Sequence, residues 1–457
     1  MGEKNRMETE PVGKLLLKMA VPTVLAQIVN LLYNIVDRMY VGRIEGIGTL
    51  ALGGLGVSFP ILILISAFSY LIGAGGASRA AIFMGRKEND TAERILGSCT
   101  LMTIIASAVL TVFFLVFREP ILLIFGATPE NLPFAMEYTQ IYLYGTIFVL
   151  SALGLNMFIT NQGFTKTSMA TVCIGAVLNI ILDPIFIFGF NMGVRGAALA
   201  TIISQCVSAV WVVVFLTSKR TILKIKIKYL RLPWAVVSGV ISLGISPFIM
   251  QATECLVQLV FNRGMRTYGD NNYIALMSIL FSLTQMIWMP LQGISQGAQP
   301  IIGYNFGAGN KERVKSTFKI LFITNVAFSV GVILLVELFP QIFLGCFTPD
   351  ENVISIGKNA LRLFLAGMSL MGAQSACQQT FLALGQAKIS TFLALLRKVI
   401  LLIPLALILP PLGLGVWGFF LAEALSDVIA ATVTTTMFKL KINGILERGA
   451  QGQKLKA

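Results

Sequence analysis

The sequence contains no histidine among its 457 residues. Histidine is the commonest metal ligand and the side chain best suited to proton transfer near neutral pH. Its absence excludes membrane enzymes that depend on a catalytic or metal-binding histidine. The six cysteines are scattered, five of them within apolar segments, and they show neither metal-ligand spacing nor a disulfide framework. They are Cys99, Cys173, Cys206, Cys255, Cys346 and Cys377.

Charged residues are also scarce, at 12%, whereas soluble domains carry about 25%. Apolar residues make up 56% of the chain, and the mean hydropathy is +0.81. Apolar segments long enough to cross a bilayer, which takes about 20 residues, recur along nearly the whole sequence. No small-residue cleavage site follows the first of them, so we expect it to be kept as a span. The composition therefore predicts a polytopic membrane protein.

Sequence signals for nucleotide chemistry are missing as well. There is no Walker A pattern, so we do not expect ATP to drive the protein. The segment Gly413-Leu-Gly415-Val-Trp-Gly418 matches a dinucleotide-binding pattern in its letters. It opens an apolar segment and follows no strand, which is the wrong context for that function. We therefore expect neither an enzyme nor a bound cofactor.

Twelve membrane-spanning helices account for the apolar segments. Their expected ranges are 14–40, 51–82, 95–118, 136–160, 166–190, 195–217, 235–266, 272–300, 316–342, 356–384, 389–410 and 414–438. They divide the chain into an N-terminal segment (1–13), two six-helix bundles (14–217 and 235–438), a linker (218–234) and a C-terminal tail (439–457).

The net charge of +14 is explained by its distribution along the chain. With both ends in the cytoplasm, 25 of the 35 lysines and arginines fall on cytoplasmic segments and eight on the opposite side. Cytoplasmic loops of membrane proteins carry such an excess of positive charge. We therefore expect a multi-pass protein of the plasma membrane with both termini cytoplasmic. No nucleic-acid partner and no obligate protein partner is expected.

The two halves of the sequence repeat each other. Five glycine pairs are each separated by 222 positions. They are Gly75 and Gly297, Gly85 and Gly307, Gly145 and Gly367, Gly163 and Gly385, and Gly196 and Gly418. Because six spans return the chain to its starting side, the two bundles have the same orientation. The repeat therefore predicts two six-helix bundles related by a pseudo-two-fold axis along the membrane normal.

An acidic residue interrupts the fifth apolar segment, in Asn179-Ile-Ile-Leu-Asp183-Pro184. A charged side chain in the middle of a span costs about 2.5–3.5 kcal/mol on insertion scales and marks a functional site by default. Asn179 and Asp183 are four residues apart, so they share one helix face. Pro184 deprives the carbonyl of Ile180 of its helical partner. These oxygens suit a small cation or a proton, and the alternative is a proline kink with a polar residue that a neighbouring helix satisfies.

Polar side chains also follow one face of the first and seventh spans at steps of three or four residues. They are Gln27, Asn30, Asn34 and Asp37 in the first span, and Gln251, Glu254, Gln258 and Asn262 in the seventh. Such stripes indicate a wet cavity between the bundles, or else interhelical hydrogen bonds. Two nearby carboxylates, Asp37 and Asp183, favour a shared proton or cation, because like charges brought close do not both stay ionised.

Several of these motifs together resemble a known family. They are Pro22, Asn34-Ile-Val-Asp37-Arg-Met-Tyr-Val-Gly42, Asn179-Ile-Ile-Leu-Asp183-Pro184, Gly193-Val-Arg-Gly196-Ala-Ala-Leu-Ala-Thr201, Gly297-Ala-Gln-Pro300 and Gly303-Tyr-Asn-Phe-Gly307. In this order, over residues 12–440, they resemble the multidrug and toxic compound extrusion (MATE) family, and most closely its bacterial NorM-, DinF- and MepA-type members. The resemblance implies an all-α, V-shaped pair of bundles around a central cleft.

The same resemblance implies export of lipophilic, often cationic, drugs by antiport with H⁺ or Na⁺, and it gives this chain a cation site at Asp37, Asn179, Asp183 and Thr201. No metal beyond Na⁺ at that site is expected. The residues expected to line the substrate cleft are Gln27, Asn30, Asn34, Asn156, Gln205, Gln251, Glu254, Gln258, Met286, Met289 and Gln292. The alternative function is that of a related flippase for lipid-linked precursors.

Overall fold

The computed structural model describes residues 3–454, and regular secondary structure in that range is entirely helical. Eleven helical segments are long and apolar enough to cross a membrane. The segments Leu132–Tyr144 and Thr146–Asn161, which meet at a bend of 62°, make a twelfth span when taken together. The all-α polytopic fold predicted from the sequence is therefore confirmed for the described part of the chain.

The first half holds the helices up to the linker. They are α1 (Glu3–Thr9), α2 (Val12–Gly42), α3 (Gly48–Gly85), α4 (Asn89–Ile124), α5 (Leu132–Tyr144), α6 (Thr146–Leu150), η1 (Ser151–Leu155), α7 (Asn156–Asn161), α8 (Thr165–Pro184), η2 (Ile185–Gly189) and α9 (Val194–Thr217). The linker contains one 3₁₀ turn, η3 (Ile227–Tyr229).

The second half repeats this order. Its elements are α10 (Trp234–Tyr268), α11 (Asn271–Gly307), α12 (Lys311–Leu338), α13 (Pro340–Gly345), α14 (Glu351–Leu365), η4 (Ala366–Leu370), α15 (Met371–Ala383), α16 (Ala387–Leu395), η5 (Leu396–Leu402), α17 (Ile403–Ile408), η6 (Pro410–Leu412) and α18 (Val416–Lys454). Helix α18 thus continues through most of the predicted C-terminal tail.

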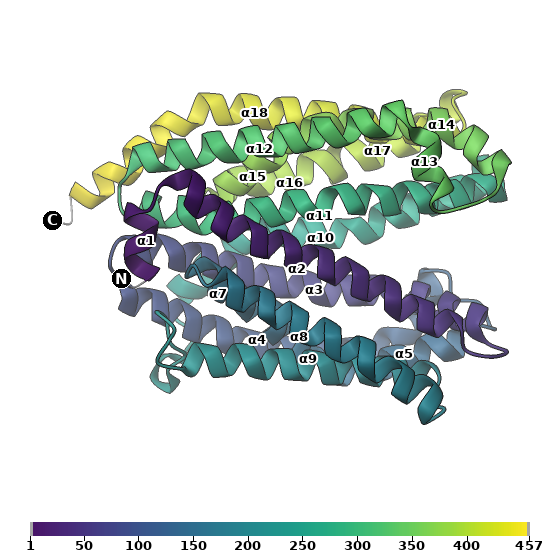
Figure 1. Cartoon of the computed structure of the whole chain (residues 1–457), viewed down its shortest axis with the longest axis horizontal. Helices are drawn as coiled ribbons and strands as arrows, with labels where there is room; N and C mark the ends of the chain where they lie inside the picture. The colour runs from purple at the N-terminus through teal and green to yellow at the C-terminus, as the bar shows by residue number, and fades with distance from the viewer. Residues whose placement is uncertain (1–2, 455–457) are drawn as a thin grey trace.

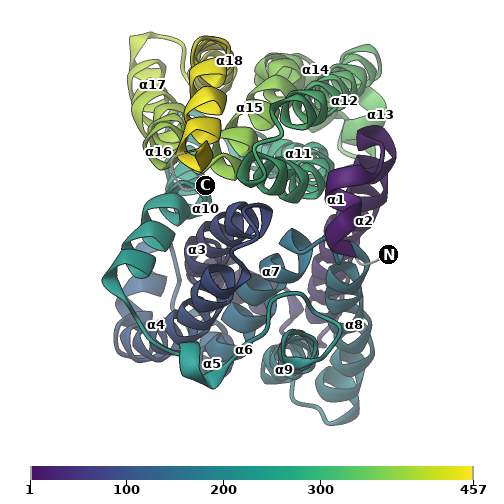
Figure 2. The same cartoon turned by 90° about the vertical axis from the view of Figure 1, so that its left-hand side faces the viewer.

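The two halves form separate bundles that lie side by side (Figures 1 and 2). Helices α2 and α3 of the first bundle pack against α10 and α11 of the second. Both termini lie at the same end of the molecule (Figure 1), as an even number of spans requires. We call this the terminal end of the molecule.

Glycines bring the bundles together at the terminal end. A Cβ atom added to Gly85 of α3 would lie 2.0 Å from the carbonyl oxygen of Tyr304 in α11. A Cβ atom added to Gly307 would lie 2.0 Å from the carbonyl oxygen of Ile82. Tyr304 follows Ile82 by 222 positions, as Gly307 follows Gly85, so the two contacts are equivalent halves of one pseudo-symmetric interface. Only glycine allows the backbones to approach this closely.

Three spans contain π-helical turns, η1, η2 and η5. Such turns are rare and occur frequently at functional sites. Segment η2 follows Asp183 and Pro184 directly, and η5 contains Arg397 and Lys398. Two of the three π-helical segments, η2 and η5, therefore lie at ionisable residues inside a bundle.

The linker packs against the first bundle at the terminal end. The side-chain oxygen of Gln162 accepts hydrogen bonds from the Thr221 hydroxyl at 2.8 Å and from the N–H groups of Ile222 and Leu223 at 2.9 and 2.7 Å. Lys226 forms an ion pair with Glu93 of α4. The connection between the bundles is thus anchored by specific contacts.

Candidate functional site

Two buried carboxylic acids meet inside the first bundle. Asp37 comes from α2 and Asp183 from α8, two helices that pack along each other. The two carboxyl groups are close enough to influence each other electrostatically. The sequence predicted both residues, and the fold brings them together from positions 146 residues apart.

An amide and a hydroxyl complete this group. The Asn179 side-chain nitrogen donates to an oxygen of Asp183 at 3.3 Å and to the Thr201 hydroxyl oxygen at 3.4 Å. The Thr201 hydroxyl donates to the carbonyl of Ala197 at 3.0 Å. The four residues predicted as a cation site therefore form one buried cluster, which we call the acidic cluster. Its role in ion binding stays a prediction.

Three oxygens of the acidic cluster have no hydrogen-bond partner within the described protein. They are Oδ1 of Asp37, Oδ2 of Asp183 and Oδ1 of Asn179, and all are buried. A buried polar atom without a partner costs about 1–3 kcal/mol. Hard cations such as Na⁺ take oxygen ligands of this kind, as Ca²⁺ and Mg²⁺ do. A proton on either carboxyl group would also satisfy the pair. The donor set therefore fits a small monovalent ion.

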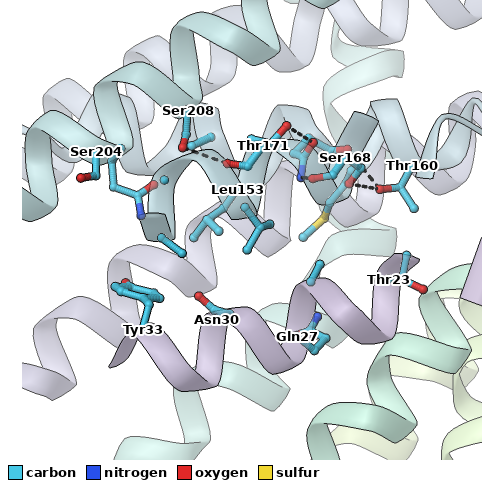
Figure 3. Close-up of a pocket in the computed structure, with 18 of the residues that line it drawn as sticks. Thr23, Gln27, Asn30, Tyr33, Leu153, Thr160, Ser168, Thr171, Ser204 and Ser208 are labelled. Carbon is cyan, nitrogen blue, oxygen red and sulfur yellow. Dashed lines mark hydrogen bonds between the residues drawn. The ribbon is translucent and has the colours of Figure 1, made fainter. Parts of the chain in front are cut away.

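A cavity of about 130 Å³, lined largely by polar residues, adjoins the acidic cluster. Figure 3 shows part of its lining, including Gln27 and Asn30 of α2 and Ser208 of α9. Asn179 and Thr201 form part of its wall, and the predicted residues Gln27, Asn30, Asn156 and Gln205 line it as well. Its hydroxyl groups are bonded mostly to one another and to the backbone, as in the 2.7 Å bond from Thr160 to Ser168. The volume is enough for several water molecules.

A second cavity, of about 320 Å³, lies between the two bundles. The two cavities are adjacent, because six residues line both: Gln27, Asn30, Tyr70, Met157, Thr160 and Gln296. Six of the predicted cleft residues line it. They are Gln27, Asn30, Gln251, Glu254, Met289 and Gln292. We call this second cavity the central cavity.

Three of the predicted cleft residues line neither of these two cavities. Asn34 donates instead to the carbonyl of Asn30 in its own helix, at 2.6 Å. Met286 is 48% exposed, and Gln258 is half-buried. A stripe with steps of three and four residues spans a wide helix face, and only part of that face reaches the cavity.

The second bundle contains contacts between charged side chains that were not predicted from the sequence. Arg397 donates to Asp427 at 2.7 Å and to Glu423 at 3.3 Å. Lys398 forms an ion pair with Glu254. We call these five residues the charged cluster. The repeat could have located it, because Glu423 and Asp427 follow Thr201 and Gln205 by 222 positions.

Comparison with known proteins agrees with this architecture. The MatE family profile matches residues 22–185 and 247–408. The multidrug export protein MepA of Staphylococcus haemolyticus is 25% identical over 94% of this chain and 95% of its own length. The protein of the same name from Staphylococcus aureus is 27% identical over 93% and 94%.

Solved structures share the fold. A crystal structure of MATE in the bent conformation aligns with a TM-score of 0.90 at 21% identity, covering 98% of this chain and 99% of its own. An outward-facing multidrug resistance MATE family transporter of the MOP superfamily aligns with a TM-score of 0.88 at 21% identity, covering 97% and 98%. These likenesses support the V-shaped arrangement of two bundles. The profile covers well over half of the sequence, and the chain therefore belongs to the MatE family of membrane transporters.

Proposed function

We propose that this protein is a secondary active multidrug exporter, which moves lipophilic and cationic compounds outward in exchange for H⁺ or Na⁺. The names of the relatives support multidrug export. The observation that carries the coupling is the acidic cluster, whose unpartnered oxygens lie beside a cavity that adjoins the central cavity. An ion bound at Asp37 and Asp183 would neutralise these carboxylates or bend the first bundle. Either change would alter the shape of the adjoining substrate cavity.

The direction of transport follows from the orientation proposed for the chain in the plasma membrane. With both termini in the cytoplasm, the glycine contacts at the terminal end close the cytoplasmic side. The ion then enters the acidic cluster from outside while the substrate leaves by the same side. A return to the inward-open state releases the ion to the cytoplasm. One charge moved down 100 mV supplies about 2.3 kcal/mol, enough for about fiftyfold concentration of a neutral substrate.

The test is efflux of a fluorescent organic cation from proteoliposomes, with a sodium gradient and a proton gradient imposed separately. We expect one gradient to drive efflux by the wild type and Asp183→Asn to abolish this gradient-driven part. Glu45→Gln is the matched control, because Glu45 is an exposed carboxylate on the loop after α2.

Full gradient-driven efflux by Asp183→Asn would refute the coupling role of the acidic cluster. Absence of flux under both gradients, together with movement of a lipid-linked precursor between leaflets, would favour the flippase instead.

A further inference from the structure

The lysine of the charged cluster lies at the wall of the central cavity. Its ammonium pairs with Glu254 and donates to the carbonyl of Met250 at 3.1 Å. The Lys398 side chain is 11% exposed and that of Glu254 is 32% exposed. Glu254 is therefore the more accessible partner, and it lines the central cavity together with Lys398.

The other cation of the cluster is held more firmly. Arg397 bonds to two carboxylates, Asp427 and Glu423, and its guanidinium lies 5.8 Å from the ring centre of Trp288. The Asp427 side chain is 1% exposed. Removing Arg397 from these partners would strand two buried charges, which costs several kcal/mol. Lys398 pairs with a single carboxylate, so it can change its partner more easily than Arg397 can.

The charged cluster contains three acidic and two basic side chains. Among the described residues, Glu254, Glu423 and Asp427 form ion pairs with Arg397 and Lys398 alone. One oxygen of Glu423 and one of Asp427 are buried without a hydrogen-bond partner in the described protein. The cluster is therefore balanced by one proton or by one additional positive charge, and the unpartnered oxygen of Glu423 offers Lys398 an alternative acceptor.

The walls around Glu254 suit an aromatic or lipophilic ligand. Phe281, Trp288, Met289 and Phe364 line the central cavity, as do Met250 and Met368. Aromatic faces attract cations, and the attraction is stronger where water is excluded. Methionine side chains adapt to ligands of different shape. A carboxylate within such walls matches a lipophilic organic cation.

We propose that Lys398 is a tethered counter-ion, which an incoming organic cation displaces from Glu254. The displaced ammonium turns to the free oxygen of Glu423, and it returns to Glu254 when the substrate leaves. Lys398 thus competes with every cationic substrate and sets how tightly the cavity holds it. This assignment rests on the proposed export function, because it takes lipophilic cations as the substrate class.

The first bundle has no equivalent of this tether. Positions 222 before Arg397 and Lys398 are Gly175 and Ala176, both on the wall of the polar cavity. The acidic cluster therefore has no lysine at the position that matches Lys398, whereas the charged cluster contains one. In this proposal the first bundle binds the coupling ion and the second bundle binds the organic cation.

The test is equilibrium binding of radiolabelled tetraphenylphosphonium to the purified full-length chain in detergent, without any gradient. Lys398→Met removes the competing charge, and we expect it to bind this cation at least about fivefold more tightly than the wild type. Lys398→Gln keeps a hydrogen-bond donor for Glu254 and should tighten binding in the same way if the methionine variant does not fold. Glu254→Gln should weaken binding at least about tenfold.

Two controls isolate the charge effect. The affinity for triphenylphosphine oxide, a neutral ligand of similar shape, should stay unchanged in both lysine variants. Lys315→Met breaks an exposed lysine–glutamate pair on α12 and should leave both affinities unchanged. Unchanged or weaker cation binding in folded Lys398→Met and Lys398→Gln would overturn the proposal, as would a wild type that binds no tetraphenylphosphonium. Tighter binding without gradient-driven export would support the tether and count against the proposed antiport alone.

Discussion

A single methyl group at the terminal end should shift the balance between the two states of the transporter. In Gly85→Ala the new Cβ would lie 2.0 Å from the carbonyl oxygen of Tyr304. Contacts of a Cβ atom normally begin at 3.4 Å. The obstacle is backbone on a helix of the other bundle, so no rotamer change relieves it. The bundles must separate by about 1 Å or more, or the helices must distort.

The cost of this overpacking should be about 1–3 kcal/mol. Because the clash exists only while the terminal end is closed, it raises the free energy of that state alone. A difference of 1.4 kcal/mol is a tenfold change in an equilibrium constant. We therefore expect Gly85→Ala to lower the ratio of closed to open terminal ends by about fivefold to a hundredfold.

The assay is the distance between spin labels on exposed positions of the two bundles near this end, Arg86 and Lys315, in a background without native cysteines. The Gly85→Ala variant should gain a population at longer distance. Gly331→Ala is the control, because Gly331 lies within α12 with open space around it. An unchanged distance distribution in Gly85→Ala would show that the glycine contact does not hold the terminal end closed.

Two further predictions concern the linker. The hydrogen bond to Glu93 raises the pKa of the Lys226 ammonium. This pair should therefore stabilise the fold fully at every pH below the ordinary lysine pKa of about 10.4. The stabilisation should be lost as the pH rises through the raised pKa. Melting curves between pH 8 and 12 should show this loss in the wild type and not in Glu93→Gln. The variant Gln162→Leu should lose about 2 kcal/mol of folding stability, because the N–H groups of Ile222 and Leu223 lose their acceptor. A melting temperature equal to that of the exposed control Gln140→Leu would contradict this.

Most of the acidic cluster could be predicted from the sequence, because helix spacing and the rarity of acidic residues in apolar spans both indicate it. Asn179 and Asp183 share a helix face by their spacing alone. Asp37 stood out as an acidic residue in an apolar span. Thr201 entered only through the family resemblance, since one hydroxyl among many on an apolar helix gives no signal of its own.

The repeat points to Glu423 and Asp427, but the pairing of the acids with Arg397 and Lys398 could not be predicted from the sequence, for a geometric reason. Adjacent residues on a helix point in different directions, so Arg397 and Lys398 contact different neighbours. Their partners lie on α18 and α10. Packing across the whole bundle decides which helices flank a given face. The periodicity within one span carries no information about those neighbours. The close packing at the Gly145 bend also depends on a neighbouring helix, because a side chain at this position would collide with Ile202 of α9.

The reciprocal contact of Gly85 with Tyr304 and of Gly307 with Ile82 has the form of an isologous interface, in which a surface meets its own copy. In a true homodimer every substitution appears on both sides of the axis at once. Here the two copies are fused in one chain, so each side accepts changes that the other never receives. The contact surface can stay self-complementary while the interiors diverge, and one half has come to hold a lysine where its copy holds Ala176.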